Sequence, residues 1–142
     1  MTINEYFRKP QRFKNKIIVI SAKDEASRYI SNFTTASGLG LSMKLKFRAS
    51  YVAVVDMKRD FVYERSSGTN IECSYRIKNK YIDIISAGFE SGNLSSVRVG
   101  DNEYSHNATG INVVILKNKS LGLVDSFFAD SFLDGTLTLK RL

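Results

Sequence analysis

The residue types that most often perform catalysis are scarce in this chain. Its 142 residues include one histidine, His106, and one cysteine, Cys73. A serine or cysteine nucleophile usually needs a histidine base that a carboxylate holds in place, and neither Cys73 nor any serine has a sequence setting that points towards His106. Zinc sites need a cluster of cysteine and histidine ligands, so one of each is too few. We therefore predict a protein that is not an enzyme and has no metal ion or cofactor, with His106 in a solvated loop.

Acidic and glycine-rich pairs match other functional motifs only in part. Asp24-Glu25 is better explained as the start of a helix than as an acid–base couple, because acidic residues favour the positive end of a helix. Gly38-Leu39-Gly40 follows a predicted helix instead of a strand, and it lacks the third glycine of a dinucleotide-binding fingerprint. Asp130 and Asp134-Gly135 do not have the spacing of a calcium loop, and we interpret them as turn formers.

Aromatic residues indicate a different chemistry, that of sugar binding. Pyranose faces stack on aromatic rings, while asparagine, aspartate and arginine side chains bind the hydroxyl groups. The same rings could belong to the core, where an aromatic side chain is more often found. The aromatic residues near predicted turns or strand ends are Tyr51, Phe89, Tyr104, Phe127, Phe128 and Phe132.

The net charge of +7 is concentrated towards the ends of the chain. We predict a basic N-terminal arm at residues 1–16, followed by a single domain at residues 17–142, as the length suggests. Docking on nucleic acid, docking on an acidic protein and plain solubility are all compatible with such an arm. The basic side chains that would dock are Arg8, Lys9, Arg12, Lys14 and Lys16.

Two absences bear on where the protein works. No run of about 18 apolar residues occurs, so no membrane-spanning helix and no membrane partner are predicted. The first sixteen residues, MTINEYFRKPQRFKNK, contain no apolar segment of the kind that a secretory signal needs. We therefore expect a cytoplasmic protein or a component of a phage particle, with its oligomeric state open.

The hydrophobic pattern predicts a β-rich α+β fold. Residues 16–22 (KIIVISA) form a continuous apolar run rich in β-branched side chains, which is typical of a strand buried on both faces. One principal helix is predicted at about residues 24–37, where Ala26, Tyr29, Ile30 and Phe33 form an apolar stripe. We expect this helix to pack on compact, sandwich-like antiparallel or mixed sheets. Further strands are predicted at residues 43–48, 51–55, 61–63, 71–77, 81–85, 94–99, 112–117, 121–128 and 136–142.

Two segments of the first half match a known pattern. Residues 20–29 (ISAKDEASRY) pass from a predicted strand to a predicted helix through Lys-Asp-Glu, and residues 45–51 (LKFRASY) precede the strand at 52–55 (VAVV). These segments resemble the interleukin-like EMT-inducer family. That family includes the PANDER-like cytokines and the stem domain of protein O-mannose N-acetylglucosaminyltransferase.

The second half matches the same family. Residues 86–88 (SAG) with Asn93 are similar to its opening, and residues 110–114 (GINVV) to one of its strands. Residues 124–126 (VDS) leading to Asp130 complete the resemblance. The family places this half first, so the chain resembles a circular permutant with halves at residues 17–56 and 81–132. Residues 57–80 replace the connection of the family, and Ala49 and Ala129 stand where the family has aspartate and phenylalanine.

The resemblance implies a compact β-rich sandwich without enzymatic activity of its own. The stem domain, which belongs to the same family, binds a glycan. By the same resemblance, Arg48 would donate to sugar hydroxyls or a carboxylate, Asp130 would accept, and the turn with Ser91 and Asn93 would lie beside them, with Tyr51 near. The alternative is an internal bond from Arg48 to Asp130 or to the backbone.

Two functions remain open from the sequence. The first is a non-catalytic recognition module that binds a carbohydrate or a protein surface and is encoded by a phage or a bacterium. The second is a small basic phage or bacterial cytoplasmic protein that docks on nucleic acid or an acidic host protein through its N-terminal arm.

Overall fold

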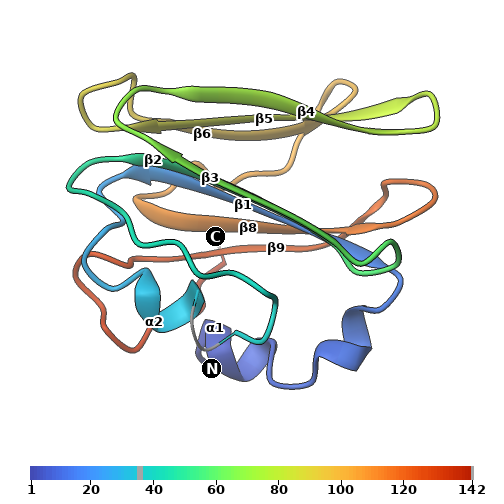
Figure 1. Ribbon diagram of the computed structural model, residues 1–142, viewed down its shortest axis with the longest axis horizontal. Coiled ribbons are helices and arrows are strands. Elements are labelled where there is room, and N and C mark those ends of the chain that lie inside the picture. The colour runs from blue at the N-terminus through green and yellow to red at the C-terminus, as the bar shows by residue number, and fades with distance from the viewer. Residues whose placement is uncertain (35–36, 142) are drawn as a thin grey trace.

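The computed structural model describes residues 1–34 and 37–141 and is organised around its first strand, β1 (Lys16–Asp24). Strands β2 (Ser50–Asp56) and β8 (Gly110–Lys117) pair with β1 in antiparallel orientation, one on each side. Figure 1 shows these three strands side by side in the middle of the molecule. Because both edges are paired and both faces are covered, β1 needs the continuous apolar sequence that it has.

The large layer of the sheet contains five strands. Edge strand β3 (Phe61–Ser67) pairs with β2, and β9 (Leu123–Ala129) pairs with β8, all antiparallel. The register between β8 and β9 shifts between Ile115 and Leu116. The order in this layer is therefore β3-β2-β1-β8-β9.

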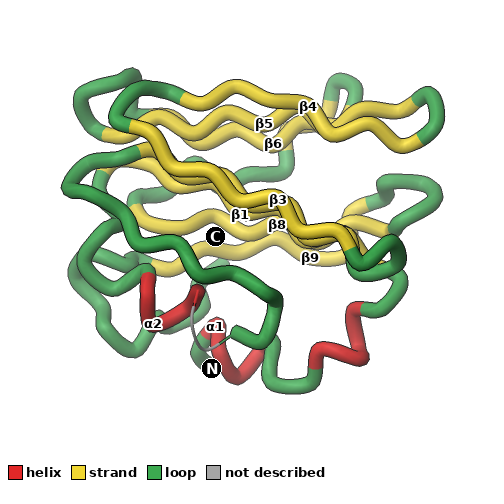
Figure 2. Tube along the Cα trace, viewed as in Figure 1, coloured by secondary structure: helices red, strands yellow, loops and turns green. Residues whose placement is uncertain are grey.

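A smaller layer lies above it (Figure 2). It consists of β4 (Ile71–Ile77), β5 (Lys80–Gly88), β6 (Leu94–Val99) and the short β7 (Asn102–Glu103), each antiparallel to its neighbour. The last two residues of β5 pair in parallel with the end of β1. The nine strands thus form one mixed sheet that folds into two layers joined at this corner.

Two hydrophobic cores follow from the alternation of β1. Ile17 and Val19 point between the two layers, where they meet Ile82 and Ile84 of β5. Ile18 and Ile20 lie in the other core, beneath the large layer. Successive residues of a strand face opposite sides, so one apolar strand supports both cores.

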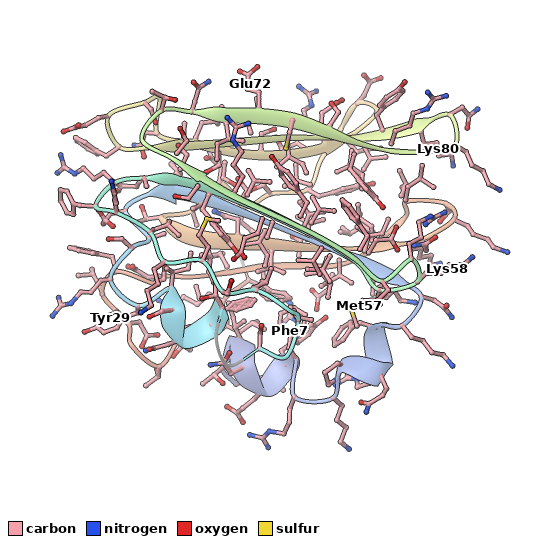
Figure 3. All side chains as sticks on the ribbon, viewed as in Figure 1. Phe7, Tyr29, Met57, Lys58, Glu72 and Lys80 are labelled. Atoms are coloured by element: carbon pink, nitrogen blue, oxygen red, sulfur yellow. The ribbon has the colours of Figure 1, made fainter. Side chains whose placement is uncertain are left out.

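The N-terminal segment closes the lower core. Helix α1 (Ile3–Tyr6) and the 3₁₀ turn at Pro10–Phe13 cover the face of the large layer, with Ile3, Phe7 and Phe13 buried. Figure 3 shows Phe7 between this segment and the strands. Its ring centroid lies 5.2 Å from that of Phe13. The predicted arm is therefore an integral part of the core, although its basic side chains Arg8, Lys9, Arg12 and Lys14 are exposed and Lys16 is half-buried.

A C-terminal ion pair holds the same segment. Arg141 donates from Nε to Oδ1 of Asp125 at 2.9 Å and from Nη2 to Oδ2 at 2.6 Å, and the Tyr6 hydroxyl also donates to Oδ2. The guanidinium and then the hydroxyl outweigh partial burial and keep the pKa of Asp125 below its ordinary value. Both chain ends are thereby attached to β9.

The prediction of one principal helix at residues 24–37 is wrong. Helix α2 covers only Ser31–Thr34, and residues 35–36 lie outside the described part of the chain. Strand β1 continues to Asp24, which has a positive φ of 63°, so it cannot begin a helix there. The apolar stripe of the predicted helix is still buried, because Ala26, Ile30 and Phe33 cover the lower core as an irregular segment.

Other strand predictions differ in extent. The alternating residues 43–48 form no strand, and residues 136–141 contribute isolated bridges alone, such as Phe128 with Lys140. Among the helices in the described residues, none is long and apolar enough to cross a membrane.

The buried N-terminal segment predicts the effect of a substitution. We expect Phe7→Ala to lower the free energy of unfolding by about 3–5 kcal/mol, because it removes a fully buried ring from a close-packed core. Urea denaturation followed by circular dichroism measures this. Arg8→Ala, at an exposed neighbour, should stay within about 0.5 kcal/mol of the wild type. Equal stability of the two variants would contradict the packing of this segment.

Candidate functional site

A cleft of about 450 Å³ opens where β1 ends. One wall comes from the turn before β2 and from the turn between β5 and β6, and the other comes from the turn after β9. The end of β1 and the residue before β8 contribute the rest of the lining. The residues that line the cleft are Asp24, Glu25, Phe47, Arg48, Phe89, Thr109, Asp130, Phe132 and Leu133.

Arg48 is held on both its backbone and its side chain. Its backbone has a positive φ of 56°, and its amide donates to Oε2 of Glu25 at 2.6 Å. The guanidinium carbon lies 4.2 Å from the ring centroid of Phe89 and 4.9 Å from that of Phe47, both within cation–π range. Nη1 is 3.4 Å from the exposed carboxylate of Glu90, which is a weak surface pair. The rings therefore orient the guanidinium beside the cleft.

Glu25 is a buried carboxylate with a structural role. Oε1 accepts from the amide of Ser27 at 2.7 Å and from its hydroxyl, while Oε2 accepts from Arg48. A buried carboxylate is tolerated when hydrogen bonds satisfy it, as they do here. Glu25 thereby ties the end of β1 to the turn that carries Arg48.

The turn with Arg48 also lies directly on β5. A Cβ atom on Gly88 would lie 2.0 Å from the carbonyl oxygen of Arg48, so this position accepts glycine alone. Two serine hydroxyls join β2 to β5 at the same place. Ser50 accepts from the amide of Gly88 at 3.1 Å, and Ser86 accepts from the amide of Tyr51 at 2.9 Å. This close approach fixes the wall of the cleft.

Two carboxylates face the cleft from other elements. Asp24 accepts a hydrogen bond from the hydroxyl of Thr109 at 3.2 Å. Oδ1 of Asp130 accepts from the amides of Phe132 and Leu133 at 3.0 and 3.1 Å, which closes the turn after β9. Oδ2 of Asp130 has no hydrogen-bond partner within the described residues, so it remains an acceptor for a ligand.

The structure brings together two of the five ligand-binding residues predicted from the sequence. Arg48 and Asp130 both line the cleft, and no hydrogen bond or ion pair joins these two described residues. Ser91 and Asn93 do not line it. Their amides both donate to the carbonyl of Gly88, at 3.1 and 2.9 Å, and so shape the turn that carries Phe89.

The prediction for Tyr51 is wrong. Its side chain is fully buried in the lower core, and its hydroxyl donates to Oε2 of Glu64 at 2.7 Å. Burial, and then this bond, raise the pKa of Tyr51 well above its ordinary value. Tyr51 therefore supports the fold and does not reach a ligand.

Sequence reasoning missed part of the cleft. The alternation at residues 43–48 predicts a strand through Phe47, and the acidic pair predicts a helix start at Asp24. Instead, Phe47 lies in a loop and Asp24 ends β1, and both line the cleft. Thr109 gave no signal in the sequence, because its position depends on the pairing of β8 with β1.

His106 lies away from this cleft. Its Nε2 is 2.8 Å from the hydroxyl of Ser126 and 3.0 Å from the Ser126 carbonyl, and its ring packs against Phe128 at 5.4 Å. Within the described residues, no group of three or more histidine, cysteine, aspartate or glutamate side chains could hold a metal ion.

Comparison with protein-family models, curated proteins and solved structures finds no match for this chain. The resemblance to the interleukin-like EMT-inducer family, with its circular permutation, therefore stays a prediction.

The close approach at the cleft wall can be tested directly. We expect Gly88→Ala to lower the free energy of unfolding by at least about 2 kcal/mol, because the new methyl group would overlap the Arg48 carbonyl. Gly68→Ala is the matched control, since a Cβ there meets no atom within 4 Å. Chemical denaturation measures the free energy of unfolding of both variants. A Gly88→Ala protein as stable as the control would show that the turn does not lie against β5.

Proposed function

We propose that the protein is a non-catalytic recognition module that binds a carbohydrate in the cleft at the end of β1. The observation that carries the proposal is the arrangement of exposed apolar side chains around a fixed guanidinium. Phe47 is 66% exposed, Phe89 50% and Leu133 73%. An exposed apolar cluster rimmed by polar groups is typical of a binding surface.

The polar groups of the cleft suit a ligand rich in hydroxyls. Each hydroxyl both donates and accepts a hydrogen bond, so a sugar site needs donors and acceptors together. Arg48 supplies planar N–H donors, Thr109 a hydroxyl, and Asp24 and Asp130 carboxylate oxygens. These groups converge from four separate segments of the chain on one concave space.

The size of the cleft favours a small ligand over a protein surface. Its volume of about 450 Å³ falls within the roughly 300–1,000 Å³ that is usual for small-molecule sites. A flat partner would contact the exposed side chains Phe47, Phe89 and Leu133 and leave the less exposed Asp24 and Thr109 of the lining without a contact.

Among the residues that line the cleft, the one buried carboxylate, Glu25, has a structural role, which supports binding without turnover. Glu25 already accepts hydrogen bonds from Ser27 and Arg48, so both of its carboxylate oxygens are occupied. A source in a phage or a bacterium, as expected from the sequence, belongs to the same proposal.

We expect Arg48→Gln to weaken glycan binding by about 1.5–3 kcal/mol, at least tenfold in Kd, because a charged forked donor is lost. A glycan array with the wild-type protein identifies the sugar, and titration calorimetry then measures the variants. Arg76→Gln is the matched control: Arg76 is an exposed arginine that packs on Tyr81 at 5.7 Å, in the small layer.

The result that would overturn the proposal is equally specific. A folded wild-type protein that binds no sugar on the array would contradict carbohydrate recognition. Equal losses for the two arginine variants would place the binding elsewhere, and release of a cleaved product would contradict a non-catalytic role.

Asp130→Asn separates ligand binding from folding. Asparagine keeps a carbonyl Oδ1 for the amides of Phe132 and Leu133, so we expect the free energy of unfolding to change by less than about 0.5 kcal/mol. The charged acceptor at Oδ2 is lost, and sugar affinity should fall roughly tenfold. Calorimetry and urea denaturation measure the two effects. Unchanged affinity in this variant would remove Asp130 from the site.

A further inference from the structure

A second site lies at the other end of β1. There a pocket of about 400 Å³ is lined by four lysines and by neighbouring polar residues. Lys16 begins β1, Lys58 lies in the turn between β2 and β3, Lys117 ends β8, and Lys119 lies in the turn between β8 and β9. Antiparallel pairing brings these four segments together at one end of the strands of the large layer.

These lysines have no carboxylate partner. None of the ion pairs within the described residues involves Lys16, Lys58, Lys117 or Lys119, and no hydrogen bond engages their ammonium groups. Asp60, in the same turn as Lys58, forms no ion pair with them. Like charges that share one pocket repel each other, and a bound anion removes this repulsion.

The one acid beneath the pocket is already neutralised. Asp56 is fully buried, and its carboxylate accepts from Nη1 of Arg59 at 2.9 Å, from the Tyr75 hydroxyl at 2.8 Å and from Nδ2 of Asn118 at 2.8 Å. Burial raises the pKa of Asp56, but the hydrogen bonds from Tyr75 and Arg59 outweigh it and keep that pKa below its ordinary value. The network fixes Asn118, which lines the pocket, and leaves the lysines uncompensated.

The positive surface continues onto the small layer. Nζ of Lys80 donates to the carbonyl of Ser120, a pocket residue, at 3.2 Å. Figure 3 shows Lys58 and Lys80 at the same end of the molecule. Tyr81 follows Lys80 in β5 and lines a neighbouring pocket together with Lys80 and Ser120. Tyr81 is 48% exposed, and the guanidinium carbon of Arg76 lies 5.7 Å from its ring centroid. The lysines and the exposed Tyr81 therefore line two neighbouring pockets that share Ser120.

We propose that this lysine pocket binds the phosphodiester backbone of single-stranded nucleic acid. Lysine ammonium groups are point charges without the fork that reads base edges, which favours phosphate contacts independent of sequence. An exposed tyrosine beside a cationic track stacks on an unpaired base, and duplex DNA offers no such base. The site is separate from the cleft, since the eight residue steps of β1 place the two ends about 25 Å apart.

The test compares two charge reversals of equal size. In Lys58→Glu/Lys119→Glu, both changes fall on exposed turn residues of the pocket; in Arg8→Glu/Lys9→Glu, both fall on exposed residues of the N-terminal segment. Fluorescence anisotropy with a labelled oligothymidine at several salt concentrations measures affinity. We expect the pocket variant to bind at least about tenfold more weakly than the wild type and to reduce the salt slope by at least about 1 unit, since each phosphate contact contributes about 0.7. The control variant should bind within about threefold of the wild type.

Each other outcome would overturn the proposal. Loss confined to Arg8→Glu/Lys9→Glu would place binding on the N-terminal segment, and equal losses would indicate attraction by net charge alone. Wild-type binding to heparin but not to the oligonucleotide would assign the pocket to sulfated polysaccharide. An unchanged circular dichroism spectrum and urea midpoint in both variants would exclude unfolding as the cause. We expect both to be unchanged because all four substituted side chains are exposed.

Discussion

The whole structure depends on the backbone pairing of β1. This strand is hydrogen-bonded along both edges, to β2 and β8, and its last two residues also pair with β5, which joins the two layers. Its side chains support a core on each face. A polar or bulky residue at Ile18 or Val19 would therefore disturb a core and two strand pairs at once. The corner with β5 demands small residues, since β5 reaches the Arg48 turn through Gly88 and Ser86.

Much of the strand pattern could be predicted from the sequence, whereas the helix could not. Apolar β-branched runs and alternation depend on burial alone, and the structure has strands at most of the positions that they indicate. A stripe such as Ala26, Ile30 and Phe33 reports burial too, but it does not distinguish a helix from an irregular segment on a sheet. The acidic residues that suggested a helix start make tertiary contacts instead: Glu25 binds the Arg48 amide. Those partners are more than twenty residues apart in sequence, so no local pattern reveals them.

The candidate site was predictable in two of its polar residues and not in its shape. The family resemblance led to Arg48 and Asp130, and the structure places both on one cleft. Tyr51 was expected there because an aromatic residue near a strand end can be exposed, but in β2 its ring enters the lower core. Phe47 was missed for the opposite reason, since the alternation from residue 43 assigns it to a strand face. Whether an aromatic ring is buried or exposed depends on strand boundaries, and these are the least certain part of a pattern.

The two ends of β1 explain how one small domain can carry two unlike surfaces. The strand is rigid and apolar along its length, so its polar neighbours lie in the turns beyond each end. At the Asp24 end, Arg48 lines the cleft together with the carboxylates of Asp24, Glu25 and Asp130 and is bordered by exposed rings. At the Lys16 end, the buried acid Asp56 forms an ion pair with Arg59, and the lysines of the pocket form no ion pair within the described residues. At that end, the anion that we propose would relieve the repulsion between the lysines in the free protein. Because the two linings have no residue in common, we expect the two proposed ligands to bind independently.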